Sequence, residues 1–389
     1  MQSRVGSFSS LEEGQVPHRI MHQYSKIFPL RLLLLFLLLG VGIVFLYISM
    51  YTYRFVSIHS VVSPTPSRIQ THSCVEGSKN LEGWIKPPSA LLHEMNDSEL
   101  FWRASFGPLI EKYPFKRTPK IAFMFLTRGP LPLAPLWDKF FKGNEKLYSI
   151  YIHSLPLYEP EFQPSSAFYG RQIPSQVAEW GGMSMCDAER RLLANALLDI
   201  SNEWFVLVSE ACIPLRNFTT IYTYISESRF SFIGAFDEDG PYGRGRYNGH
   251  MAPEVNLSDW RKGSQWFEIG RKLATDMVQD TLYYSKFDQF CRPHSCYADE
   301  HYFPTMLTLH SPHLLANRTL MWVDWSRGGP HPATLGENDL IERFFTETIG
   351  GGSCMYNNQP TNLCFLFARK VAAAALDHLL ENSSKFFGI

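Results

Sequence analysis

Hydrophobic residues along this chain of 389 residues form one long run near the N-terminus and several short runs after it. The long run, residues 32–50, contains 19 residues and no charge. A helix of this length is just long enough to cross the roughly 30 Å hydrocarbon core of a bilayer. The run occurs only once, so the pattern predicts a single membrane span with everything after it on one side.

The residues that flank the run predict its orientation. Arg19, Lys26 and Arg31 lie in the N-terminal approach to the run, whereas Arg54 and Arg68 are the only basic residues close behind it. Positive charge favours the cytoplasmic side, so residues 1–31 are predicted to be a cytoplasmic tail and residues 32–50 a transmembrane signal anchor. A cleaved signal peptide is the alternative, but its apolar core has roughly 7 to 15 residues and ends in small residues. Here the run is longer and is followed by Tyr-Thr-Tyr.

The short apolar runs beyond the anchor predict an α/β fold. They are rich in β-branched and aromatic residues and lie at residues 121–127, 148–154, 204–210 and 230–237. The stretches between them have the spacing of amphipathic helices, and such alternation is typical of a mostly parallel sheet covered by helices. Polar segments rich in proline and glycine precede these runs. We therefore expect a luminal stalk at residues 51–118 and a catalytic domain at residues 119–389.

Three helices are expected in this domain. The first begins at Ser184, where Asp187 completes a capping box. The second covers about residues 263–284, and the third starts near Asn338. Their apolar residues recur at intervals of three and four positions.

Two further patterns agree with a luminal location. Five Asn-x-Ser/Thr triplets, the acceptors of N-glycosylation, all follow the anchor: Asn96, Asn217, Asn256, Asn317 and Asn382. All seven cysteines also follow it: Cys74, Cys186, Cys212, Cys291, Cys296, Cys354 and Cys364. An oxidising lumen would allow disulfides and leave at least one thiol unpaired.

Composition and charge restrict the class of partner. The chain is 45% hydrophobic and 14% aromatic, which is typical of a globular protein, and its formal net charge is −1. It has no basic field that would attract nucleic acid, so partners must be inferred from the candidate sites.

In an open α/β sheet, ligands bind beyond the carboxyl ends of the strands. The expected ends carry polar residues: Thr127 and Arg128, His153 and Ser154, residues 209–212, and residues 237–239. They predict a polar rim at one edge of the sheet, although Thr127 and Arg128 also fit an ordinary turn.

Three segments in this order resemble the core-2/I-branching β-1,6-N-acetylglucosaminyltransferase family, most closely its plant branch. They read VAEWGGMSMCDAERRLLANAL, WFVLVSEACIPLRNF and SCYADEHYFPTML. The resemblance extends from about Lys120 to the C-terminus. It implies a Rossmann-like type A glycosyltransferase fold with helices on both faces of the sheet, preceded by one transmembrane helix. It also implies a single-pass type II protein of the Golgi membrane, with inverting transfer of a sugar from a UDP donor.

The resemblance assigns roles to individual residues. Glu300 matches the carboxylate that removes the proton of the acceptor hydroxyl. Its neighbour Asp299 would cap the helix, and a plain capping pair is the alternative for both. Lys370, in Phe-Ala-Arg-Lys, matches the lysine that contacts the diphosphate. Its arginine partner is Arg327 or Arg369, of which Arg327 is preferred.

Together with the strand ends, these assignments give a set of donor-binding candidates: Thr127, Arg128, His153, Arg327, Arg369 and Lys370. Sugars stack on aromatic rings and bind carboxylates, which gives acceptor-binding candidates: Glu238, Tyr247, Trp322, Asp324 and Trp325. The stretch from Arg244 to Tyr247 either receives an acidic acceptor or closes over the donor as a mobile loop.

No metal or other cofactor is expected, because the family replaces the metal with basic side chains. The alternative is a metal-dependent transferase with Mn²⁺ or Mg²⁺ on Asp237 and Asp239. A zinc cluster of Cys291, His294, Cys296 and His301 is a second alternative, but the compartment favours disulfides. We therefore expect Cys291–Cys296 near Glu300 and Cys354–Cys364 near Lys370.

These expectations describe a Golgi glycosyltransferase that uses a UDP-sugar donor and a glycan or glycoprotein acceptor. The transferred sugar is N-acetylglucosamine, or xylose or glucuronic acid. The alternative is an anchored glycan-binding protein of the same fold without turnover, which would not need Glu300 and Lys370 together.

Overall fold

The computed structural model describes residues 40–46, 49, 87–88, 90–106, 113–293, 295–348, 350 and 352–389. The chain divides into two compact units, Met1–Glu76 and Gly77–Ile389. In the first unit, residues 40–46 are helical. The predicted tail, most of the predicted anchor and most of the stalk lie outside the described residues. Within the part described, no helix combines the length and the apolar character that a membrane span requires.

A four-stranded sheet lies at the centre of the second unit. Its strands are β1 (Lys120–Leu126), β2 (Tyr148–His153), β3 (Asn202–Ser209) and β5 (Glu268–Gly270), in the order β2-β1-β3-β5. Strand β1 is parallel to both β2 and β3, and only β5 is antiparallel. The register pairs Leu126 with His153 and with Ser209, so the carboxyl ends of three strands meet at one edge. The prediction of these three strands and of a mostly parallel sheet is confirmed.

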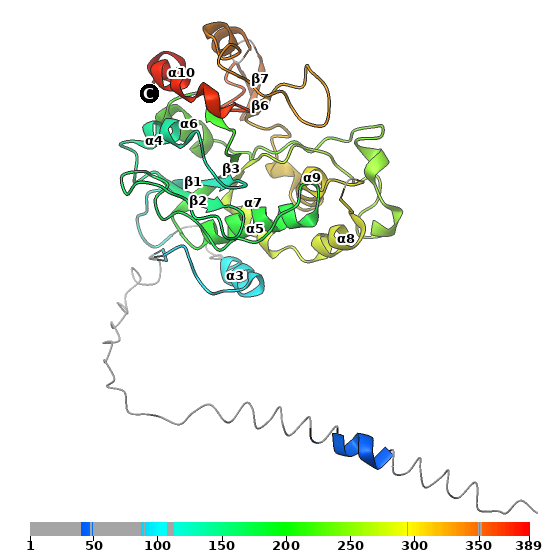
Figure 1. Ribbon diagram of the computed structural model, residues 1–389. Coiled ribbons are helices and arrows are strands. Elements are labelled where there is room, and N and C mark those ends of the chain that lie inside the picture. Colours follow the sequence, from blue (N-terminus) through cyan, green and yellow to red (C-terminus); the bar gives the residue numbers. More distant parts are fainter. Residues whose placement is uncertain are drawn as a thin grey trace, which may run out of the picture. The chain divides into compact units, whose positions relative to one another are not determined.

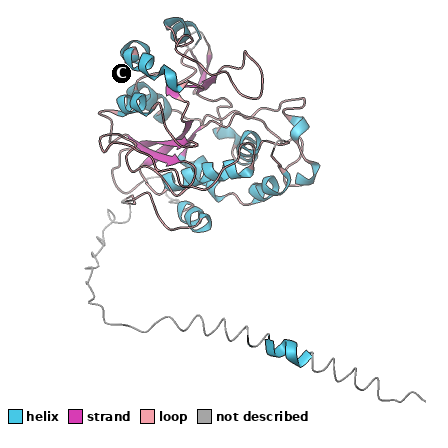
Figure 2. Ribbon diagram, in the orientation of Figure 1, coloured by secondary structure: helices cyan, strands magenta, loops and turns pink. Residues whose placement is uncertain are grey.

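Helices cover both faces of the sheet, as predicted for the α/β class (Figure 1). Helices α4 (Ala134–Phe141) and α6 (Phe218–Ser226) lie on one side, and α5 (Met183–Leu197) and α7 (Arg271–Gln279) lie on the other. Long loops connect many of these elements (Figure 2). The remaining helices and strands are α3 (Asp97–Ala104), β4 (Ile213–Pro214), α8 (Leu282–Phe290), α9 (Ala298–His310), β6 (Met321–Val323), β7 (Cys354–Tyr356), β8 (Gln359–Thr361), β9 (Phe367–Arg369), α10 (Leu376–Glu381) and α11 (Ser383–Phe387).

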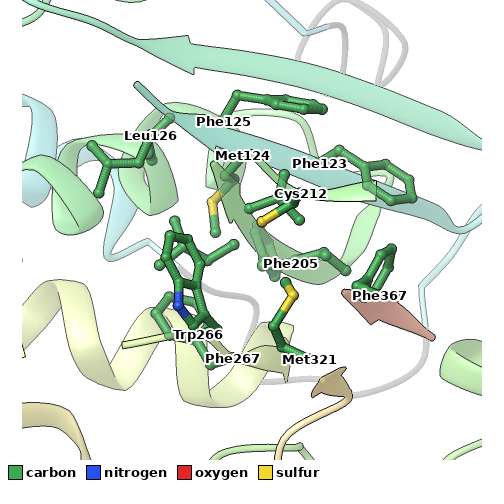
Figure 3. Packing of buried hydrophobic residues seen from close by; sticks show 14 of the residues in the cluster. Phe123, Met124, Phe125, Leu126, Phe205, Cys212, Trp266, Phe267, Met321 and Phe367 are labelled. Atoms are coloured by element: carbon green, nitrogen blue, oxygen red, sulfur yellow. The ribbon is translucent and has the colours of Figure 1, made fainter. Parts of the chain in front are cut away.

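Strand β1 is buried on both sides, which explains its continuous apolar sequence. The ring of Phe123 packs edge-on against Trp137 and Phe141 of helix α4. Figure 3 shows Phe125 and Met124 on opposite sides of the strand, with Phe205 close to Met124. Each such side chain contributes about 1.5–3 kcal/mol through burial, so this core fixes the strand ends that form the site.

The apolar run at residues 230–237 is not a strand, contrary to the prediction. It forms only isolated bridges, among them Phe232 with Glu268 and Phe236 with Lys262. Between these bridges the backbone at Gly234 lies so close to Gly263 that a side chain on Gly263 would overlap the Gly234 carbonyl oxygen. The two segments therefore cross at a pair of glycines, and a ladder does not continue there.

The helix predicted for residues 263–284 is also wrong. The segment forms strand β5 and helix α7, and a second helix, α8, begins at Leu282. Asp280 separates the two helices, because its carboxylate accepts hydrogen bonds from the backbone N–H groups of Leu282, Tyr283 and Tyr284. The sequence pattern did not reveal strand β5, because its apolar spacing continues without a break into α7.

Two smaller expectations also need correction. The helix at Ser184 exists, but its N-cap is Gly182, and the Ser184 hydroxyl accepts a hydrogen bond from the backbone N–H of Glu179. No capping box forms. The helix expected from Asn338 is reduced to a short π-helix, Phe344–Thr348, and the two residues before it.

Helix α3 lies inside the range predicted as stalk, yet it belongs to the compact unit 77–389. Asn96 and Glu99 form a capping box at its start. Leu100 and Ala104 are buried in the core, and Asp97 binds Arg191 of α5 through both carboxylate oxygens, at 2.8 and 2.7 Å. The folded unit therefore includes residues well before Lys120.

Both predicted disulfides are present, Cys291–Cys296 and Cys354–Cys364. The first precedes helix α9, which carries Glu300, and the second precedes strand β9, which ends next to Lys370. Cys186 and Cys212 are buried free thiols. Cys74 and His294 lie outside the described residues.

Candidate active site

A cavity of about 380 Å³ opens at the carboxyl ends of β1, β2 and β3. We call it the donor cavity. Its polar lining includes five of the six donor-binding candidates from the sequence, and these are Thr127, Arg128, His153, Arg369 and Lys370. The predicted polar rim therefore exists at three of the four expected strand ends. The fourth, at residues 237–239, is absent from the lining because residues 230–237 are not part of the sheet.

Cations dominate the charge of the donor cavity. Arg128, Arg369 and Lys370 line it, and Glu210 is the single carboxylate among the described residues of the lining. The guanidinium of Arg369 stacks over the ring of Trp266 at 4.1 Å. Burial lowers the pKa of Arg369, and burial together with Arg369 lowers the pKa of Lys370. A bound anion would relieve this crowding of positive charge.

The end of the cavity near β2 is built around a neutral histidine. His153 is buried, and burial, followed by the nearby Arg191, lowers its pKa to about 4. The backbone N–H of Gln176 donates to His153 Nε2 at 3.4 Å. Thr127 uses its hydroxyl locally, in hydrogen bonds with the backbone of Gly129, so it shapes the loop after β1.

A second cavity of about 670 Å³ contains Glu300. We call it the acceptor cavity. Its lining is aromatic and basic: Trp180, Tyr242, Arg246, Lys262, Tyr297, Glu300, Trp325, Gly329 and Pro330. Trp180 lines both cavities. Its ring lies 5.0 Å from that of Tyr297 and 4.8 Å from that of His331, so the two cavities adjoin at this indole.

Glu300 lies in the first turn of helix α9 and faces the acceptor cavity. Arg246 donates to its Oε2 at 2.6 Å, and the same guanidinium covers the ring of Tyr297 at 4.3 Å. This ion pair fixes the position of the Glu300 carboxylate in the wall of the acceptor cavity. The chemistry available here is therefore removal of a proton from a group bound between the aromatic rings.

Asp299 does not cap the helix, contrary to the prediction. The N-cap is Tyr297, whose backbone is left-handed. The Asp299 carboxyl points into the protein, where Asp299 is 4% exposed and no described residue forms a hydrogen bond with its Oδ1. Burial and the adjacent Glu300 raise its pKa to about 7. The two neighbouring carboxyl groups thus lie in different environments, one buried and one facing the acceptor cavity.

The structure separates Arg327 from the donor cavity. Arg327 is exposed and binds Asp339 at 3.3 Å. It lines neither the donor nor the acceptor cavity, whereas its rival Arg369 lies next to Lys370 in the donor cavity.

The acceptor candidates are divided in the same way. Trp325 lines the acceptor cavity, and Glu238 binds Lys262, which also lines it, at 3.2 Å. Tyr247 packs on Trp260 and donates its hydroxyl hydrogen to Val255 O. Trp322 packs on Phe344. Asp324 accepts a hydrogen bond from the backbone N–H of Ser326. These last three lie outside both linings.

Several lining residues were missed by the sequence reasoning, above all Trp180, Gln265, Tyr297 and His331. Each stands in a loop within two residues of a glycine, a proline or the Cys291–Cys296 disulfide. Glycine-rich loops with an aromatic or amide side chain are the signal that could have identified them.

Three of the four carboxylate oxygens of Asp237 and Asp239 are bound by Arg244. Arg244 binds both oxygens of Asp237 at 2.7 Å and one oxygen of Asp239 at 2.8 Å. In the described part of the chain, no group of three or more histidine, cysteine, aspartate or glutamate side chains has the arrangement of a metal site.

The five glycosylation candidates lie at the surface or partly buried. Asn96, Asn256 and Asn317 are exposed, whereas Asn217 and Asn382 are partly buried. Asn96 and Asn217 cap helices α3 and α6. Their modification remains a prediction.

Comparison with known proteins agrees with the geometry. Residues 121–349 match the sequence model of the Core-2/I-Branching enzyme family. Over 352 residues the chain is 36% identical to the protein named Glycosyltransferase BC10 of Oryza sativa subsp. japonica. That alignment covers 79% of this chain and 87% of the rice protein.

Proposed function

The chain belongs to the plant branch of the core-2/I-branching enzyme family and is a glycosyltransferase, and we propose that it transfers a sugar from a UDP-sugar to a hydroxyl of a glycan acceptor. Transfer inverts the anomeric carbon and needs no metal. The observation that carries the proposal is the junction of the two cavities at Trp180. On one side lie three cations, and on the other lies a paired carboxylate.

The reaction follows from this arrangement. The acceptor oxygen attacks the anomeric carbon of the donor while the bond from that carbon to the diphosphate breaks. Glu300 takes the proton of the acceptor hydroxyl. Negative charge develops on the departing UDP, where Arg369 and Lys370 stabilise it. The stacking of Arg369 on Trp266 holds this charge in place before the reaction.

Two observations support the absence of a metal. The formal Asp-x-Asp at residues 237–239 is engaged by Arg244, and the donor cavity already has three cations against one carboxylate. The donor sugar is N-acetylglucosamine, xylose or glucuronic acid, as the resemblance implies. We further propose a Golgi location, with residues 32–50 as the membrane anchor and the unit 77–389 in the lumen.

Release of UDP tests this proposal. The purified protein is incubated with UDP-N-acetylglucosamine, UDP-xylose or UDP-glucuronic acid, a panel of glycan acceptors and EDTA. We expect acceptor-dependent release of UDP from one donor with EDTA present. E300Q should lower kcat by about 10²–10⁴-fold, whereas the control E342Q, in an exposed pair with Lys385, should not.

Full transfer by E300Q would reject Glu300 as the base. Loss of activity in EDTA would favour a metal-dependent transferase. Binding of glycans without release of UDP from any donor would favour the non-catalytic binding protein.

A further inference from the structure

Gln265 lies in the wall of the donor cavity. Two residues before it, the backbone N–H of Gly263 donates to the carbonyl oxygen of Glu300 at 2.8 Å. The residue after it is Trp266, which supports Arg369. The segment 263–266 therefore connects the residues that hold the diphosphate with the residue that acts on the acceptor. A sugar on a diphosphate held beside Arg369 would therefore lie close to this segment.

A buried carboxyl group orients this amide. Glu189, on helix α5, is fully buried, and its Oε1 accepts a hydrogen bond from Gln265 Nε2 at 2.7 Å. Its Oε2 has no hydrogen-bond partner among the residues that the structure describes. Burial raises the pKa of Glu189 well above its ordinary range, and the Asp299 carboxyl adds to the rise. An acidic residue at this position is costly, and its one polar contact is with a residue of the cavity wall.

The hydrogen bond to Glu189 commits the amide nitrogen of Gln265 to the interior. The amide oxygen is then the polar atom that remains for a ligand in the cavity. A fixed carbonyl oxygen accepts a hydrogen bond from a hydroxyl or an amide N–H, and it discriminates against a ligand that lacks such a donor.

We propose that Gln265, oriented by Glu189, determines specificity for the donor by accepting a hydrogen bond from the sugar of the UDP-sugar. This inference rests on the proposed function, because it takes the donor cavity to hold a UDP-sugar. Glu189 is a positioning residue, and Gln265 is the residue that touches the substrate.

Binding measurements separate this role from a general effect on the cavity. The dissociation constants of UDP and of the preferred UDP-sugar are measured by titration calorimetry on the full-length protein in detergent. In Q265L we expect about tenfold weaker binding of the UDP-sugar and an unchanged dissociation constant for UDP. E189M releases the amide and should weaken UDP-sugar binding selectively as well. E189Q retains a carbonyl oxygen for Gln265 Nε2. The ratio of its dissociation constants for UDP and the UDP-sugar should therefore equal that of the unaltered chain.

Three results would overturn the inference. An unchanged ratio of the two constants in Q265L would remove Gln265 from sugar recognition. If Q265L changes the ratio of the two dissociation constants and folded E189M does not, the positioning role of Glu189 is rejected. If E189M fails to fold, E189Q and Q265L still test the inference, because the inference requires E189Q to bind the UDP-sugar like the unaltered chain and Q265L to bind it more weakly. Failure of the unaltered chain to bind any UDP-sugar would reject the proposed function itself, and this inference with it.

Discussion

Two arginines compete for the role beside Lys370, and their surroundings differ. Arg369 is held against an indole in the donor cavity, whereas Arg327 is exposed and bound to Asp339. Only the first is fixed and desolvated before a substrate arrives, which is the condition under which a cation stabilises a leaving group most strongly. We therefore predict that R369A lowers kcat by about 10²–10³-fold and that R327A has a much smaller effect. Steady-state kinetics of both variants decides between them, and a larger loss in R327A would return that residue to the diphosphate.

The buried Asp299 should make stability depend on pH. Its pKa rises from the ordinary 3.8 to about 7, chiefly through burial. Well below pH 4 both the folded and unfolded forms are protonated, so Asp299 adds no pH dependence to the stability there. As the pH rises towards 7, the unfolded chain loses this proton first, and the free energy of unfolding falls by up to about 1.4 kcal/mol per pH unit.

D299N should remove this decrease. The unfolding free energy of D299N minus that of the unaltered chain should therefore increase between pH 4.5 and 7. Urea denaturation over this range measures the difference. D377N, which alters an exposed aspartate, is the control and should keep the original slope. Parallel pH curves for D299N and the unaltered chain would contradict the raised pKa.

Residues whose place in a cavity could be predicted from the sequence are those that stand in a local motif. Lys370 follows Phe-Ala-Arg, and Glu300 follows Ala-Asp at a helix start. Arg246 reaches Glu300 from 54 positions away, and Glu189 reaches Gln265 from 76 positions away. Such pairs arise from the packing of distant elements, and the sequence pattern alone has no local signal for them.

The same contrast holds for whole elements. Strands β1, β2 and β3 were predicted because each is a short apolar run bounded by polar residues. The segment from residue 263 was misread because β5 has only three residues and continues directly into α7. Residues 230–237 are apolar but do not form a strand. They pass close to the segment around Gly263 at Gly234, and only isolated bridges form there. Local composition thus predicts the centre of the sheet better than its edge.

The loop before helix α9 is an element whose rigidity should matter for activity. Cys291 and Cys296 close it directly before Tyr297, which begins the helix of Glu300 and contacts Arg246 and Trp180. We predict that the double variant C291S/C296S loses about 2 kcal/mol of stability and at least tenfold in kcat/KM. The control C354S/C364S should lose a comparable amount of stability, but its loss in kcat/KM should be smaller. Chemical denaturation and UDP release on both variants measure these effects, and equal activity losses would show that the first disulfide has no special relation to the site.

At the scale of the whole molecule, the boundary of the folded unit can be tested by truncation. The compact unit begins at Gly77, so a chain of residues 77–389 should remain soluble and keep the kcat of the full-length protein.

Removal of residues 1–112 also removes helix α3. It would expose the surface under Leu100 and Ala104 and leave the buried Arg191 without Asp97, and an unpaired buried charge costs about 3–5 kcal/mol. We predict that residues 113–389 are expressed in insoluble form or melt far below residues 77–389 in a thermal unfolding assay. The variant D97N in residues 77–389 separates the two causes, since it removes the ion pair and keeps the helix. Full stability of residues 113–389 would mean that α3 belongs to the tether, and the catalytic unit would then begin close to Lys120, as the hydrophobic pattern first indicated.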